Sequence, residues 1–193
     1  MRDEHLEAIA SGLLRRARAR GLWDGSAPIP VERLIERLLG VRIEFDYLDD
    51  GGGAHVLGKL VIHERTIYIN TADRERFELI VGLERYTLAH EAGHFELHVD
   101  QGGYLQTNLG LDLSTDAILC RDGDTSPREY QAERFGAYLL MPEDLVRHAV
   151  GSADTSQWST VLSLRDLFQA SGAAMRNRLR FLKYPVPESQ FAS

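Results

Sequence analysis

The stretch RYTLAHEAGHFELH, residues 85–98, carries the pattern His-Glu-x-x-His at positions 90–94. An α-helix advances 3.6 residues per turn, so His90 and His94 would lie on one face and could offer two imidazoles to one metal ion. Glu91 would stand beside them, where it could polarise a metal-bound water. Small and apolar residues flank the histidines, which favours a buried active-site helix over a solvated one. The pattern is the signature of zinc-dependent hydrolases.

The composition is that of an ordinary globular protein. With 193 residues the chain fits one domain, or one domain and a small appendage, and 44% of it is hydrophobic and 26% charged. No apolar run approaches the roughly 20 residues of a membrane span. The N-terminal residues lack the apolar core and cleavage site of a secretory signal. A single cysteine, Cys120, excludes an internal disulfide and fits a reducing cytoplasm, so we expect cytoplasmic localisation.

The charge balance argues against a duplex DNA binder. The net charge is −7, whereas such proteins usually present a strongly basic surface. Arginines cluster in residues 15–20 and 176–183, and we interpret both clusters as solvated helix faces. The segment LSLRDLFQASGAAMRNRLRFL, residues 162–182, has a helix–turn–helix outline with Gly172 near the turn. A direct DNA-binding regulator is therefore an alternative, although a disfavoured one.

The chain divides into three parts. Residues 1–27 form an N-terminal helix and linker, because Leu6, Ile9, Leu13 and Leu14 recur at helical spacing before a Gly- and Pro-containing break. Residues 28–150 form the core. Residues 151–193 form a C-terminal appendage of two short helices followed by a Pro-containing tail.

A small antiparallel or mixed sheet precedes the histidine helix. Alternating apolar residues predict a strand over 41–45, and two more β-rich runs include 60–62 and 67–69. His63-Glu64-Arg65 is expected to turn a hairpin between those two runs. The strand that contains Leu60 to Ile62 is predicted to be an edge, where an extended substrate could add as another strand.

The helices that follow the sheet are predicted from their start signals. Pro30 is placed to begin a helix that Gly40 ends. Asp73 is a candidate N-cap for one long helix running through both histidines. Residues 99–126 lack periodicity and are predicted to form a long loop. Ser126-Pro127 then begins a helix that carries EYQAERFGAYLLMP, residues 129–142.

The third metal ligand must come from elsewhere, because a catalytic zinc usually has three protein ligands and one open position. The helix from Pro127 offers Glu129 and Glu133, four residues apart on one face. This spacing suits a ligand and a second carboxylate that orients a ligating histidine. However, Ser126 and Glu129 also form a capping box, in which Glu129 would only bond back to the helix start. Spacing alone leaves both carboxylates open as the ligand.

The two segments RYTLAHEAGHFELH and EYQAERFGAYLLMP together resemble the paired motifs of the ImmA/IrrE family of metallopeptidases. That family typically reads RFTLAHELGHLLLH and then ExxANxFAxxLLMP, and the resemblance covers roughly residues 28 to 185. It implies that the glutamate opening the second motif, here Glu129, is the third ligand. Two positions depart from the pattern, because Glu133 replaces Asn and Gly136 replaces Ala. A carboxylate at 133 could alter the surroundings of the metal or compete for it.

The resemblance also implies a fold and a function. The fold is a zincin-like α+β arrangement, a helical domain with a small three-stranded sheet packed on the histidine helix. The function is that of a zinc-dependent endopeptidase that cuts a helix–turn–helix transcriptional repressor and so relieves repression of stress-response or mobile-element genes. The alternative is a non-proteolytic module that keeps the metal and binds or sequesters a regulator. The cofactor is Zn²⁺, although two histidines and a carboxylate also accept Mn²⁺ or another divalent ion.

The expected mechanism is metal-assisted peptide hydrolysis. Zinc held by His90, His94 and Glu129 would lower the pKa of a bound water towards 7. Glu91 would take its proton as general base and pass it to the leaving amine.

Other residues attract weaker hypotheses. His98 lies two turns beyond His90, about 12 Å away along a straight helix, so we do not expect it to be a ligand. Cys120 has no obvious partner, and we expect it to be inert. Three tyrosines could donate a hydrogen bond to a tetrahedral intermediate, and nothing in the sequence selects among them: Tyr86, Tyr104 and Tyr138.

Overall fold

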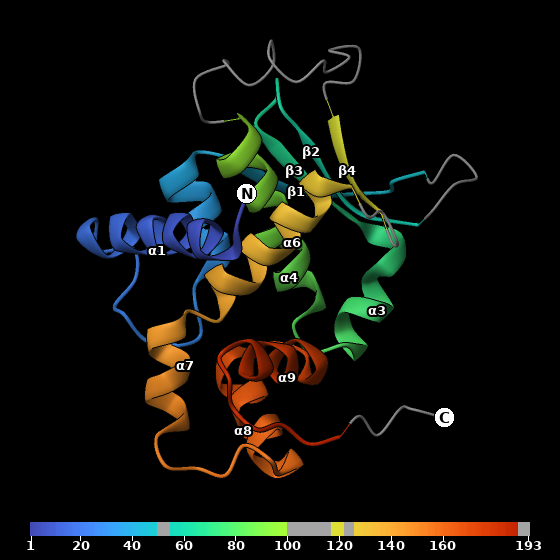
Figure 1. Cartoon of the computed structure of the whole chain (residues 1–193). Coiled ribbons are helices and arrows are strands. Elements are labelled where there is room, and N and C mark those ends of the chain that lie inside the picture. The colour runs from blue at the N-terminus through green and yellow to red at the C-terminus, as the bar shows by residue number, and fades with distance from the viewer. Residues whose placement is uncertain (50–54, 100–116, 122–125, 189–193) are drawn as a thin grey trace.

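The computed structural model describes residues 1–49, 55–99, 117–121 and 126–188, the strand 117–121 by its backbone only. It confirms the expected α+β class: α4 packs against the sheet, α6 lies beside α4, and α1 packs on α6 (Figure 1). Within the described residues, the α-helices longer than one turn are α1 (Asp3–Ala19), α3 (Arg74–Leu79), α4 (Leu83–His94), α6 (Pro127–Leu140), α7 (Glu143–Val150), α8 (Trp158–Phe168) and α9 (Gly172–Phe181). None of these described helices is both long enough and apolar enough to cross a membrane.

In the part of the chain that the structure describes, the sheet has four strands in the order β1-β3-β2-β4. They are β1 (Arg42–Asp46), β2 (Val56–Val61), β3 (Thr66–Asn70) and β4 (Ala117–Arg121). β1 runs parallel to β3, whereas β2 is antiparallel to both β3 and β4. The three expected strands are therefore confirmed, and so is the turn at His63–Arg65, where Arg65 takes a left-handed φ of 50°.

Two expectations about the sheet are wrong. β4 lies within residues 99–126, which we had expected to be a loop throughout. Since β4 pairs with β2 along Val56–Val61, the strand containing Leu60 is interior, and the outer strands of the described sheet are β1 and β4. An edge that could accept an extended substrate is thus found one strand further out.

The single long helix expected from Asp73 is also wrong, because the chain breaks into α3 and α4. Gly82 lies at the break with φ of +79°, and a Cβ there would come within 2.5 Å of the backbone oxygen of Gln169. Only glycine fits both this conformation and this close approach. Asp73 does occupy the N-cap position of α3, but its side chain makes no capping hydrogen bond to the helix. Its carboxylate instead accepts hydrogen bonds from His55 at 2.7 Å and Arg76 at 3.0 Å.

The other predicted helices are confirmed. The helix after Pro30 consists of a short α-helical turn (Val31–Arg33) and a π-helical segment (Leu34–Leu39), and left-handed Gly40 ends it. The two short C-terminal helices are α8 and α9.

One hydrophobic cluster joins α1, α4, α6, α8 and α9. Its largest members include Phe95, Phe135, Tyr138 and Phe168, each at most 2% exposed, and burial of one such side chain contributes roughly 2–3 kcal/mol. The core thus extends continuously from the N-terminal helix to the C-terminal pair.

Candidate metal centre

The helix α4 places His90 and His94 one turn apart on its buried face. They are 4% and 0% exposed, and their Nε2 atoms are 2.9 Å apart. The two rings meet edge to face, with centroids 4.6 Å apart. Both imidazoles therefore direct their outer nitrogen to the same point, as the spacing predicts.

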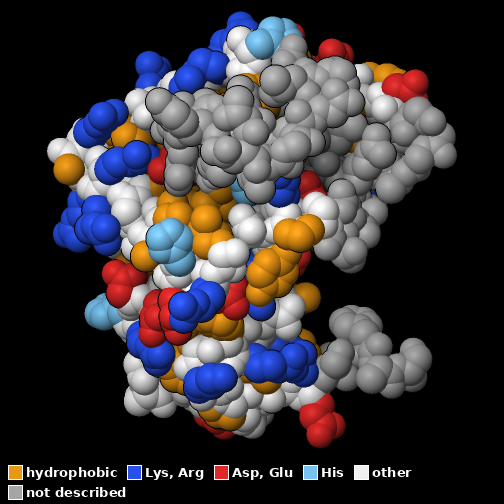
Figure 2. Space-filling view, turned by 45° about the horizontal axis from the view of Figure 1, so that its top comes forward, with side chains coloured by type: hydrophobic (Ala, Val, Ile, Leu, Met, Phe, Trp, Pro, Cys, Tyr) orange, Lys and Arg blue, Asp and Glu red, His pale blue; other side chains and the backbone are white. Residues whose placement is uncertain are grey.

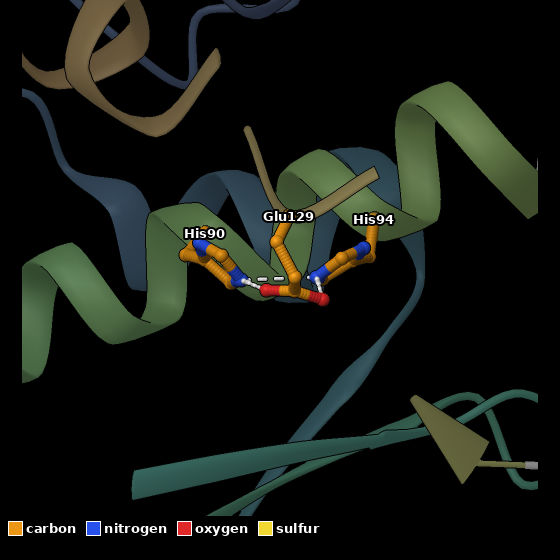
Figure 3. A group of neighbouring side chains, drawn as sticks. All are labelled: His90, His94 and Glu129. Carbon is orange, nitrogen blue, oxygen red and sulfur yellow. Dashed lines mark hydrogen bonds and ion pairs between the residues drawn. The ribbon is translucent and has the colours of Figure 1, made fainter. Parts of the chain in front are cut away.

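The first turn of α6 brings Glu129 to that point. Ser126 caps the helix, because its hydroxyl accepts the backbone N–H of Glu129 at 3.3 Å, and Pro127 occupies the first helical position. The Glu129 side chain is directed to the histidines: Oε2 lies 2.9 Å from Nε2 of His90, and Oε1 lies 3.1 Å from Nε2 of His94 (Figure 3). These three residues form a candidate zinc site.

Glu133, one turn further along α6, is not part of this cluster. Its side chain is exposed, and it lines a separate cavity between α4, α6 and α9. Nδ1 of His94 also has no hydrogen-bond partner among the described residues. In the described part of the chain, a carboxylate that orients this ligand is therefore absent.

Close approach of α4 and α6 allows Glu129 to reach the histidines. A Cβ at Gly93 would lie 3.1 Å from the Cα and the carbonyl oxygen of Ala132, and one at Gly136 would lie 3.2 Å from the backbone nitrogen of His90. Glycine at these positions lets the two backbones touch. Sequence reasoning noted Gly136 only as a departure from the family pattern and missed the role of Gly93.

The residues present fit a zinc ion. Two imidazole nitrogens and one carboxylate form a common catalytic ligand set, and ligand atoms about 2.0–2.2 Å from a tetrahedral zinc lie roughly 3.3–3.6 Å apart. The observed separations of 2.9–3.1 Å are a few tenths of an ångström shorter. A small opening of the side chains would accommodate the ion.

The pKa shifts within the cluster favour the protonation states that bind a metal. Burial tends to raise the pKa of Glu129, but the hydrogen bonds from His90 and His94 outweigh it and lower this pKa to about 2. Burial lowers the pKa of His94, while Glu129 opposes the shift. The cluster therefore favours an ionised carboxylate beside a neutral imidazole, which are the forms that bind a metal.

Glu91 is fully buried between α4 and the sheet. A Cβ added to Gly58 of β2 would lie 3.3 Å from its Oε1, so the carboxylate packs directly on that strand. Neither oxygen has a hydrogen-bond partner of good geometry among the described residues, although the backbone amide of Leu60 faces it. Burial, and next the charge of Glu129, raise the pKa of Glu91 well above its usual value. A carboxylate kept apart from partners, and made more basic, can exchange protons.

The remaining candidates lie outside the cluster of three. His98 stands in a π-helical turn (Phe95–Val99) with its ring 5.7 Å from that of His94, and burial lowers its pKa to about 4. Tyr86 and Tyr138 line the separate cavity, and Tyr104 lies outside the described residues. Of Cys120 only the backbone is described, paired with Gly58.

One contact near the site was missed. Glu96, two residues after His94, is 9% exposed, and its Oε1 lies 2.6 Å from Nη2 of Arg16 in α1. We had interpreted Arg16 as part of a solvated cluster, and no local pattern pairs residues 80 positions apart.

The comparisons with known proteins agree with this geometry. Residues 38–180 match the model of the Peptidase M78 family, described as the IrrE N-terminal-like domain. The match spans both helices that carry the metal cluster and confirms the resemblance to ImmA/IrrE metallopeptidases. None of the curated proteins compared with the sequence matches it. The chain therefore belongs to the M78 family of metallopeptidases.

Proposed function

We propose that the chain is a zinc-dependent endopeptidase that cuts a specific helix–turn–helix repressor, with His90, His94 and Glu129 as ligands and Glu91 as general base. The observation that carries the proposal is the buried cluster of three ligands with Glu91 next to one of them in the same helix. A metal-binding module without catalysis has no need of a buried carboxylate that lacks a good partner, because such a group is costly to keep.

The residues of the site would have separate roles in the proposed reaction. When bound, zinc supplies an acidified water and a Lewis acid for the scissile carbonyl. Glu91, with its raised pKa, accepts the water proton and delivers it to the leaving amine. Glu129, which is ionised because its pKa is lowered, would add a charge of −1 to the site and so partly balance the metal.

The proposed class of substrate is inferred from the family to which the chain belongs. Members resemble regulators that act on helix–turn–helix repressors, and this would place the reaction in the cytoplasm. β4 is an outer strand of the described sheet, and an extended segment of the substrate could add to it. Direct DNA recognition by α9 is disfavoured because Arg178 is buried and paired with Glu7. Figure 2 shows Lys and Arg side chains in separate groups, with acidic and apolar side chains between them.

The test uses the full chain, zinc, and a candidate helix–turn–helix repressor chosen from the products of the neighbouring genes. We expect the wild type to release discrete fragments, detected by mass spectrometry. Glu91→Gln should bind one zinc per chain and should release no fragments of the repressor. Glu36→Gln, a matched change on an exposed helix face, should cut like the wild type. Cleavage by Glu91→Gln at the wild-type rate would refute the mechanism, and binding of the intact repressor without cleavage by the wild type would favour the sequestering module.

A further inference from the structure

Three consecutive apolar residues lie exposed between α3 and α4. Leu79, Ile80 and Val81 are 81%, 41% and 46% exposed, and we call these three residues the apolar turn. Single exposed leucines are common on protein surfaces, whereas a contiguous exposed apolar patch is typical of a surface that another molecule covers. The apolar turn is therefore a candidate contact surface.

The apolar turn is held in one conformation. The backbone amide of Leu83 donates a hydrogen bond to the carbonyl of Ile80 at 3.1 Å, which closes the turn. Just after it, Gly82 packs against the backbone of Gln169, in the connection between α8 and α9. The end of α3 accordingly lies beside α9 in Figure 1. A surface that is already ordered loses less conformational entropy on binding than a flexible one.

A cavity of about 330 Å³ opens next to the apolar turn, between the first turn of α4, α6 and α9. Ile80 forms part of its wall, together with the apolar side chains of Leu83, Ala174 and Phe181. Because Ile80 is also exposed, the apolar turn lies at the mouth of the cavity. A cavity of about 150 Å³ is enough to hold a benzene molecule, so this cavity has room for a leucine or valine side chain.

The surroundings of the turn and of the cavity carry opposite charge. Residues 73–84, which contain the apolar turn, include four acidic and two basic residues. Residues 172–183, which form α9 and its end beside the cavity, include four basic residues and no acidic one. Arg178 is buried, and the other three basic residues of this segment are at least partly exposed. Glu133 is the acidic exception in the cavity wall.

We propose that the chain forms a two-fold dimer in which Leu79 and Val81 of each copy enter the cavity of the other. The apolar turn and the cavity lie side by side on one chain, so a two-fold rotation brings each against its complement at the same time. The same rotation sets the acidic segment of one copy against the basic α9 of the other, and this favours a second copy over an unrelated apolar partner. The dimer does not depend on the proposed peptidase activity.

The test is sedimentation equilibrium of the full, zinc-loaded chain at concentrations from about 1 to about 100 μM. We expect a monomer–dimer equilibrium with a Kd on the order of 10 μM. Leu79→Ser should fold normally, because the side chain it changes is 81% exposed, and should raise this Kd about tenfold or more. Tyr47→Ser, a matched loss of a 68% exposed side chain just after β1, should dimerise like the wild type.

Charge reversal tests whether the partner is a second copy. Glu75→Lys and Arg180→Glu, both at exposed positions, should each weaken the homodimer about tenfold, because like charges then meet at both contacts. A mixture of the two variants should dimerise like the wild type, since every contact of the heterodimer again joins opposite charges.

Three results would overturn the dimer. They are a wild type that stays monomeric at about 100 μM, dimerisation of Leu79→Ser equal to that of the wild type, and a mixture that associates no better than either reversal variant alone. A monomer that uses the apolar turn to bind the repressor would also overturn it, because the cavity would then serve the substrate.

Discussion

Replacement of Gly93 by alanine tests whether close contact between α4 and α6 builds the metal site. The new Cβ would lie 3.1 Å from the Cα and carbonyl oxygen of Ala132 and 3.1 Å from Cδ1 of Phe135. Carbon atoms pack best at about 3.5–4.0 Å, so the backbone of α6 must retreat by a few tenths of an ångström. Because the obstructing atoms include backbone, a side-chain rotation alone cannot relieve the contact.

The size of the effect follows from two opposing contributions. Overpacking of a close contact costs about 1–3 kcal/mol, whereas Gly→Ala inside a helix gains about 1 kcal/mol in propensity. Gly12→Ala in α1 isolates the gain, because the nearest atom to its new Cβ is the mobile end of Arg15 at 3.6 Å. The free energy of unfolding should therefore be about 1–3 kcal/mol lower for Gly93→Ala than for Gly12→Ala.

The assays are urea unfolding of the zinc-free variants and zinc competition with a chromophoric chelator. A retreat of α6 carries Glu129 away from the histidines, and we expect zinc affinity to fall about tenfold, as for other changes that misplace a ligand. Gly12→Ala should bind zinc like the wild type. If Gly93→Ala were stabilised as much as Gly12→Ala and bound zinc normally, the contact would not control the geometry of the site.

Three further predictions address the ligands, the packing and the pH response. Glu129→Gln should lower zinc affinity at least tenfold while Glu133→Gln leaves it unchanged in the same chelator competition; the reverse order would make Glu133 the ligand. Gly58→Ala should lose about 1–3 kcal/mol in urea unfolding, because its Cβ would meet Cγ2 of Thr87 at 2.8 Å. The double variant Gly58→Ala/Thr87→Ser, which lacks that methyl group, should recover most of the loss, and no recovery would contradict the contact. His98 has a folded-state pKa of about 4 against an ordinary 6.5, so the unfolded chain takes up the proton first, and stability present above pH 6.5 is lost as the pH falls towards 4. At pH 5 this loss is about 1–2 kcal/mol in the zinc-free protein, and His98→Gln should remove it; equal pH dependence of both proteins would refute the shift.

Local spacing predicted the parts of the site that depend on one helix. His90 and His94 share a face because the helix fixes their geometry, and the capping signal at Ser126 fixed where α6 begins. The position of Glu129 against the histidines depends on contact between helices that lie about 40 residues apart along the chain. The family resemblance selected Glu129, whereas spacing alone left Glu133 equally eligible.

The wrong predictions share a physical cause, which is tertiary pairing that overrides local signals. β4 lies in a polar, Gly-rich stretch without extended periodicity, and its pairing with β2 defines it. The helix break at Gly82 follows apolar residues that continue a helical pattern, and it is imposed by the backbone of Gln169 packed against the glycine. Neither partner can be identified from the local sequence.

The N-terminal helix α1 connects the two parts of the metal site, the histidines at the end of α4 and Glu129 at the start of α6. Arg16 of α1 pairs with Glu96, just after the last histidine, while Asp3 at its other end accepts a hydrogen bond from Tyr130 at 3.2 Å and lies 3.6 Å from Nε of Arg134, both in α6. Partly exposed ion pairs contribute little stability individually, so the buried apolar face of α1 supplies most of the attachment. What the polar contacts add is orientation, because one rigid helix is tied to both elements that carry ligands. A change in the angle between α4 and α6 would therefore have to break contacts at both ends of α1, and this resists the separation of Glu129 from the histidines.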